Sequence, residues 1–163
     1  MTTTRQRLRQ VVDWRATFWA GFLGGLISLG TNMVLTHLNL GSPWIFLRMV
    51  ASIVLGEGSL LPPSYSQFNI ILVGIIVHLL LSGLFAALLT IIIHRWGLLV
   101  GILGGAAFGL ALYTINFSLM SIFFPWFFPL QNWMFALSHV LFGALVGGIY
   151  EMIEVEIFVP AEK

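Results

Sequence analysis

Two histidines in apolar surroundings are the residues of this chain best suited to chemistry. His78 begins His-Leu-Leu-Leu-Ser-Gly-Leu-Phe-Ala-Ala, and His139 begins His-Val-Leu-Phe-Gly-Ala-Leu-Val-Gly-Gly. In both stretches small residues stand four and eight positions after the histidine, which is one face of a helix. An imidazole can exchange a proton, form hydrogen bonds or bind a metal. Each stretch therefore predicts a helix with a groove of small residues and a reactive group at one end of the groove.

Polar residues of the other apolar stretches fall at a similar depth. At a rise of about 1.5 Å per residue, both histidines lie roughly 12–13 Å inside their predicted spans. The predicted polar layer consists of Asn32, Asn116, His78 and His139, with Thr31, Thr114 and Ser138 beside them. The other half of the spans shows no equivalent layer. Polar groups inside a membrane are costly, so this layer is the candidate functional site.

Three interpretations of the layer remain open. The first is a network of hydrogen bonds that joins the helices without further chemistry. The second is a haem b site, in which His78 and His139 ligate the iron and the grooves admit the macrocycle. The third is a pathway for a small solute or a proton. A metal site is not predicted, because no carboxylate with ligand spacing accompanies the histidines.

The composition identifies the class of protein. Of the 163 residues, 59% are hydrophobic and only 8% are charged, whereas a soluble domain carries about 25% charged residues. The absence of cysteine excludes disulfides and thiol chemistry. No arrangement typical of hydrolases or phosphate-binding loops is present. The sequence predicts a non-enzymatic integral membrane protein.

Hydropathy divides the chain into an all-α arrangement of four transmembrane helices, built as two tandem helical hairpins. The first hairpin, 16–93, contains spans at 16–38 and 69–93 and a short interfacial helix at 43–55 between them. The second hairpin, 98–150, contains spans at 98–123 and 131–150. A basic segment, 1–15, precedes them and is expected to be a short interfacial helix. An acidic tail, 151–163, is expected to continue the last span as a helix.

The basic residues predict the orientation. In this arrangement most of the basic residues lie on one side of the membrane: Arg5, Arg7, Arg9, Arg15, Arg95 and Lys163. The other side receives only Arg48. Because the cytoplasmic side of a membrane protein carries the excess of Lys and Arg, both termini are expected in the cytoplasm. The expected location of the protein is the inner membrane.

The two predicted hairpins resemble each other. Gly-Phe-Leu-Gly-Gly at 21–25 matches Gly-Ile-Leu-Gly-Gly at 101–105, and the two histidine stretches match one another. We therefore expect an internal repeat. Small residues four apart allow close helix approach in a membrane. The residues expected at such contacts are Gly21, Gly25, Gly101, Gly105, Ser82, Ala86, Gly143 and Gly147.

Several of these stretches also resemble a known family. They are the glycine-rich first span at 21–25, Pro-Trp-Ile-Phe-Leu-Arg at 43–48, His78 with Ser82 and Ala86, and Ser138-His139. Through them the chain resembles the small four-span, uncharacterised bacterial inner-membrane proteins of the YagU-like type. The resemblance implies a location in the cytoplasmic membrane and carries over no catalytic residues.

The function expected from the sequence is that of an accessory or structural subunit. Its expected partners are the lipid bilayer and other membrane subunits or a second copy of itself, and not nucleic acid. Binding of haem b by His78 and His139, and a transport pathway, are the alternatives.

Overall fold

Four long helices form the protein, and all four are long and apolar enough to cross a membrane. The computed structural model describes residues 8–61 and 67–160. The helices are α1 (Trp14–Leu40), α3 (Phe68–Ile93), α4 (Leu98–Thr114) and α6 (Trp133–Ile153). A π-helical turn, η2 (Ile115–Leu119), and α5 (Met120–Phe123) continue α4. The prediction of an all-α protein with four helices long and apolar enough to cross a membrane is therefore confirmed. Parts of the predicted terminal segments, 1–7 and 161–163, lie outside the described residues.

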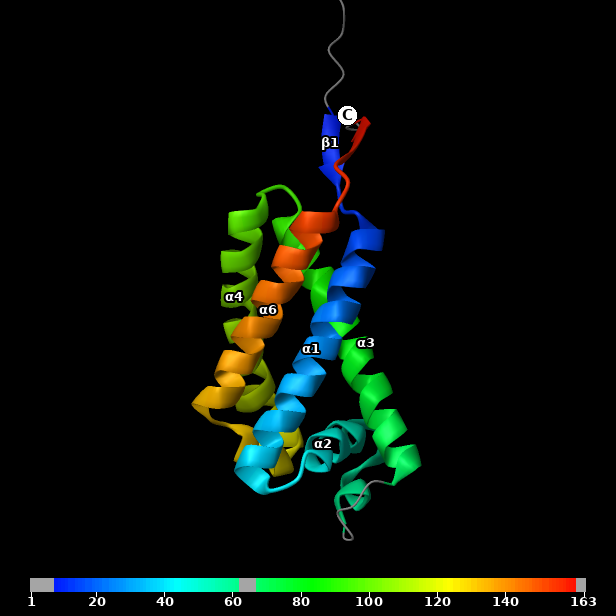
Figure 1. Ribbon diagram of the computed structural model, residues 1–163, viewed down its shortest axis with the longest axis vertical. Helices are drawn as coiled ribbons and strands as arrows, with labels where there is room; N and C mark the ends of the chain where they lie inside the picture. Colours follow the sequence, from blue (N-terminus) through cyan, green and yellow to red (C-terminus); the bar gives the residue numbers. More distant parts are fainter. Residues whose placement is uncertain (1–7, 62–66, 161–163) are drawn as a thin grey trace, which may run out of the picture.

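The helices form an elongated bundle with two distinct ends (Figure 1). α1 packs against α3 and α6, and α4 packs along α6, whereas α3 and α4 contact each other little. One end, called the terminal end below, carries the strands β1 (Leu8–Val11) and β2 (Ile157–Pro160) and the turn between α3 and α4. The opposite end, called the α2 end, carries α2 (Trp44–Leu55) and the 3-10 helices η1 (Glu57–Leu60) and η3 (Pro125–Leu130).

Small residues set the distances between helices. A Cβ added at Gly105 would collide with the carbonyl oxygen of Gly143, and one added at Gly147 would collide with that of Gly101. On the other pair, the Cβ of Ala86 lies 2.8 Å from the position that a Cβ would take at Gly21. Likewise, Gly25 faces Ser82. Close backbone approach holds helices together where lipid tails are as apolar as leucine, so these contacts bind α1 to α3 and α4 to α6.

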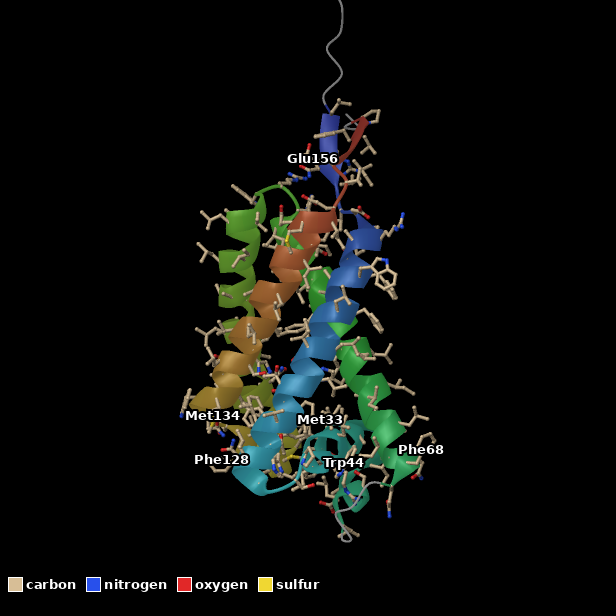
Figure 2. All side chains as sticks on the ribbon, in the orientation of Figure 1. Met33, Trp44, Phe68, Phe128, Met134 and Glu156 are labelled. Carbon is tan, nitrogen blue, oxygen red and sulfur yellow. The ribbon has the colours of Figure 1, made fainter. Side chains whose placement is uncertain are left out.

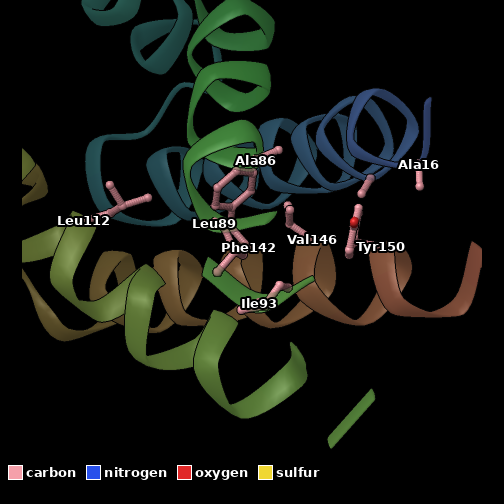
Figure 3. Close-up of a cluster of buried hydrophobic side chains, with 9 residues drawn as sticks. Ala16, Ala86, Leu89, Ile93, Leu112, Phe142, Val146 and Tyr150 are labelled. Carbon is pink, nitrogen blue, oxygen red and sulfur yellow. The ribbon is translucent and has the colours of Figure 1, made fainter. Parts of the chain in front are cut away.

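A cluster of buried hydrophobic side chains extends through the bundle toward the terminal end (Figure 3). The buried cluster there contains Leu89, Ile93, Val146 and Tyr150. The hydroxyl groups of Thr17 and Thr90 share a 3.0 Å hydrogen bond between α1 and α3. This threonine pair is a polar contact between two spans outside the predicted polar layer.

Asp13 joins the beginning of α1 to the tail. Its Oδ1 accepts hydrogen bonds from the backbone N–H groups of Arg15 and Ala16, and its Oδ2 accepts one of 3.0 Å from that of Val155. Its own N–H donates to the hydroxyl of Tyr150. Burial alone would raise the pKa of Asp13, but these backbone hydrogen bonds outweigh it and hold that pKa below its usual range.

The segments next to the membrane differ from the sequence prediction. Residues 8–11 form β1 rather than part of an interfacial helix, and the tail leaves helical structure after Ile153. β1 pairs antiparallel with β2, with Leu8 opposite Pro160 and Val11 opposite Ile157. The Ile-Phe-Val run of β2 favours an extended chain. The contact of Asp13 with Val155 lies beside this strand pair and joins segments that are 142 residues apart, which local sequence does not reveal.

The short helix α2 lies across the bundle at the α2 end (Figure 1). It begins after Pro43 and ends at Gly56, whose φ of 79° suits glycine. Residues 46–52 are buried, including Leu47 and Arg48. A Cβ at Gly74 of α3 would collide with the carbonyl oxygen of Leu47, so α2 packs tightly on α3. Outward-pointing apolar side chains such as Phe68 and Phe128 flank this end (Figure 2).

Candidate functional site

A cavity of about 370 Å³ lies among the helices toward the α2 end. Its polar lining comes from three spans and the π turn: Ser28, Asn32, His78, Ser82, Asn116 and His139. Seven phenylalanines among the described residues also line it: Phe46, Phe85, Phe117, Phe124, Phe127, Phe135 and Phe142. A pocket of this size with apolar walls and few polar groups is typical of a small-molecule site.

The structure brings the two histidines and the two asparagines of the polar layer to this one cavity. It separates the two threonines from them. Thr31 donates its hydroxyl to the carbonyl of Ile27, and Thr114 donates to that of Leu110, each within its own helix. Neither threonine lines the cavity.

Asn32 forms the most complete polar contact of the site. Its Oδ1 accepts a 2.7 Å hydrogen bond from the hydroxyl of Ser138 on α6, and its Nδ2 donates to Ser28 at 3.2 Å. Asn32 is only 4% exposed. This part of the layer is an interhelical network, in which a buried amide finds partners on its own helix and on a neighbour.

The hydrogen bond of His78 identifies its tautomer. Its Nε2 lies 3.0 Å from the carbonyl oxygen of Gly25 on α1. A carbonyl only accepts, so Nε2 carries the proton and, in the neutral ring, Nδ1 keeps its lone pair. The phenyl ring of Phe46 packs against the imidazole with its centroid 5.6 Å away. His78 is thus oriented by α1 and α2 while it lines the cavity.

His139 has the opposite tautomer. Its Nδ1 donates a 2.8 Å hydrogen bond to the carbonyl oxygen of Phe135 one turn earlier. The lone pair is therefore on Nε2, where the Nδ2 of Asn116 approaches to 3.5 Å. Tyr113 and Phe117 pack against the ring, each with its centroid 5.7 Å away. Four residues, from α4, η2 and α6, thus surround this imidazole.

The π-helical turn brings Asn116 to the cavity. It spans Ile115–Leu119, inside the third membrane-spanning helix. A π turn accommodates one extra residue and changes which side chains share a face, and such turns are frequent at functional sites. The regular spacing used for the sequence prediction contains no signal for it.

Three other parts of the lining were missed by the sequence analysis. Phe46 and Val50 belong to α2, which was expected at the membrane interface. Phe124 and Phe127 belong to the connection between the third and fourth long helices, whose aromatic and proline residues are typical of the lipid headgroup level. The Nε1 of Trp126 in that loop donates a 2.7 Å hydrogen bond to the hydroxyl of Ser52, which ties the loop to α2. The third part is Ser28, which the sequence could have indicated, since it stands one helical turn before Asn32 on the same face.

The haem interpretation meets a specific obstacle in this geometry. Nε2 of His139 faces the Nδ2 of Asn116 at 3.5 Å, and Nε2 of His78 donates to the carbonyl oxygen of Gly25. Ligation by that nitrogen would require the bond to break. For metal ions, the described residues contain no group of three or more His, Cys, Asp or Glu side chains that could bind one. The arrangement is therefore better suited to hydrogen bonding than to ligation.

Comparison of the chain with protein-family models, with curated proteins and with solved structures finds no match.

Proposed function

We propose that this chain is a non-enzymatic membrane protein that binds a small, largely apolar molecule in the cavity. The observation that carries the proposal is the convergence of Asn32, His78, Asn116 and His139 on one cavity. Each comes from a different membrane-spanning helix. Apolar walls with a few polar groups suit a ligand that is mostly hydrophobic and is oriented by one or two hydrogen bonds.

The hydrogen bonds support binding over a purely structural role. Asn32 and Ser138 bond to each other, as a structural network requires. By contrast, His78 bonds to the backbone of α1, and His139 bonds to the backbone of its own helix. Both imidazoles also connect helices, since His78 of α3 bonds to α1 and Asn116 approaches His139 of α6. Both rings nevertheless line a cavity of about 370 Å³, which a network that served only to join helices would not require.

The cluster of buried hydrophobic side chains toward the terminal end supports binding over transport. The cavity borders Leu112 and Phe142, which belong to the buried cluster that continues to Tyr150 at the terminal end. A transport pathway would require these side chains to separate. A binding site needs no such movement.

The proposed setting is the inner membrane, with both termini in the cytoplasm. Among the described residues, Arg9, Arg15 and Arg95 lie toward the terminal end and Arg48 lies at the α2 end, which supports this orientation. We further propose that the two hairpins arose by duplication. Matching glycine contacts, Gly25 with Ser82 and Gly105 with Gly143, support it. The asparagines do not follow the same register, because the glycines align Asn32 with Leu112.

Three sequence-based interpretations stay predictions. They are the role as an accessory subunit, the resemblance to YagU-like proteins, and the haem b alternative through His78 and His139. An accessory role is compatible with ligand binding, since a subunit can carry a bound molecule into a complex.

A matched pair of tryptophan variants tests the proposal. Leu81 lines the cavity, whereas the adjacent Leu80 is 69% exposed on the outside of α3. Small molecules that co-purify with the wild type, Leu80→Trp and Leu81→Trp are extracted and identified by mass spectrometry. We expect one species to be present in the first two and absent from Leu81→Trp. An identical set of molecules in all three proteins would contradict the proposal.

A further inference from the structure

We propose that the ligand of the cavity is a neutral aromatic molecule with a hydroxyl group, of the phenol or hydroquinone class, bound by His78 and Asn116. This inference rests on the proposed binding function and specifies the chemistry of the ligand. It follows from the size of the cavity, the nature of its walls and the hydrogen-bonding positions that remain open.

The cavity has room for a substituted ring. An apolar cavity of roughly 150 Å³ holds one benzene molecule, and this cavity measures about 370 Å³. Phenylalanine rings approach it from α2, η2, η3 and α6, among them Phe46, Phe117, Phe127 and Phe142. Aromatic side chains pack favourably against a second ring in edge-to-face or offset arrangements. An aromatic ligand of one ring with small substituents matches these walls.

The open positions of the lining favour a hydroxyl group. Because Nε2 of His78 donates to Gly25, its Nδ1 is an acceptor without a partner among the described residues. This Nδ1 atom is not fully buried, so part of its surface stays accessible. The same holds for Oδ1 of Asn116, whose Nδ2 approaches His139. These two acceptors require a donor from the ligand, which an ether or a ketone does not supply.

A neutral ligand fits better than a cation. The lining includes no Asp or Glu among the described residues, and the nearest side chains offer only neutral groups. A buried ammonium without a carboxylate partner loses several kcal/mol of hydration free energy. A hydroxyl avoids this loss, and it can also accept from the remaining hydrogen of the Asn116 amide.

Three probes of similar shape test the inference on the wild-type protein in lipid nanodiscs. They are p-cresol, which donates a hydrogen bond, 4-methylanisole, which does not, and 4-methylbenzylamine, which is cationic. Ligand-observed NMR gives each dissociation constant after subtraction of empty nanodiscs. We expect p-cresol to bind about fivefold more tightly than 4-methylanisole, the ratio for one neutral hydrogen bond. Equal affinities, or tighter binding of the amine, would overturn the inference.

Variants locate the hydrogen bond. His78→Phe keeps a ring in the cavity and removes the acceptor, and we expect it to abolish the preference for p-cresol. His37→Phe is the control, because His37 is exposed at the end of α1. A preference that survives in folded His78→Phe would overturn the role of His78. If 4-methylanisole binds as well as p-cresol but Leu81→Trp weakens both, only the hydroxyl inference fails. If Leu81→Trp changes neither, the proposed cavity function fails as well.

Discussion

Ser138 donates a 2.7 Å hydrogen bond from its hydroxyl to Oδ1 of Asn32, and this contact joins α6 to α1 across 106 residues of sequence. Both side chains are buried, at 3% and 4% exposed. The contact lies beside the cavity and keeps Asn32 in a fixed position. It is the part of the polar layer whose role is structural.

Loss of this contact should weaken the bundle. We predict that Ser138→Ala lowers the free energy of unfolding by about 0.6–2 kcal/mol, the usual range for a hydrogen bond between membrane helices. Unfolding in sodium dodecyl sulfate, followed by tryptophan fluorescence, provides the measurement. Thr114→Ala is the control, since the hydroxyl of Thr114 bonds only to its own helix. Equal stability of the two variants would contradict this assignment.

The contact between α4 and α6 depends on the absence of side chains. A methyl group at Gly143 would collide with the carbonyl oxygen of Gly105. We predict that Gly143→Ala lowers the free energy of unfolding by about 1–3 kcal/mol through forced separation of the helices. Gly83→Ala is the matched control, because a Cβ at Gly83 meets no atom within 4 Å. We expect its stability to stay within about 1 kcal/mol of the wild type. A similar loss in both alanine variants would show that packing is not the cause.

Acid should weaken the connection between α1 and the tail. The pKa of Asp13 is lower in the folded protein than in the unfolded chain, because three backbone N–H groups bond to its carboxylate. The folded state is thus favoured above the unfolded pKa, and this stabilisation is lost as the pH falls through the folded pKa. The stabilisation by the Asp13 carboxylate should be complete above about pH 5 and should decline below about pH 4.

Thermal unfolding of the wild type and Asp13→Asn between pH 3 and pH 7 measures this effect. Asparagine keeps an oxygen for capping α1 but does not titrate. We expect the difference in melting temperature between the two proteins to shrink as the pH falls below about 4. The comparison cancels effects of pH on groups that the two proteins share. A constant difference across the range would contradict the role of the Asp13 carboxylate.

Single cysteines can test the proposed orientation, since the chain contains none of its own. Gly58→Cys lies at the α2 end, and Glu156→Cys lies between α6 and β2 at the terminal end. With the termini in the cytoplasm, a membrane-impermeant maleimide added to intact cells should label only Gly58→Cys. After the cells are opened, both variants should react. Labelling of Glu156→Cys alone in intact cells would reverse the orientation.

The sequence predicted the parts of the fold that depend on local hydropathy. The span expected at 69–93 is α3 at Phe68–Ile93, and the short helix expected at 43–55 is α2 at Trp44–Leu55. Counting residues from the end of each span also predicted a common depth for His78 and His139, because the rise per residue of a helix is constant. These features need no information on how the helices are arranged.

Features that depend on contacts between distant segments were not predictable in this way. The π turn at Asn116 interrupts the spacing on which a sequence pattern depends. The phenylalanines of the 124–130 segment resemble interfacial anchors until tertiary structure brings them beside α2. β1 pairs with β2 across almost the whole length of the chain, next to the contact of Asp13 with Val155. In each case the partner lies far away in sequence or the helix departs from regular geometry.

The central claim is that the cavity binds a small molecule, and the affinity for p-cresol in the two tryptophan variants tests it most directly. Leu80→Trp and Leu81→Trp add the same side chain at adjacent positions, one facing outward and one lining the cavity. We predict wild-type affinity for Leu80→Trp and at least roughly tenfold weaker binding for Leu81→Trp, since a filled cavity leaves little room for the ring. Equal affinity in the wild type and both variants would contradict the account.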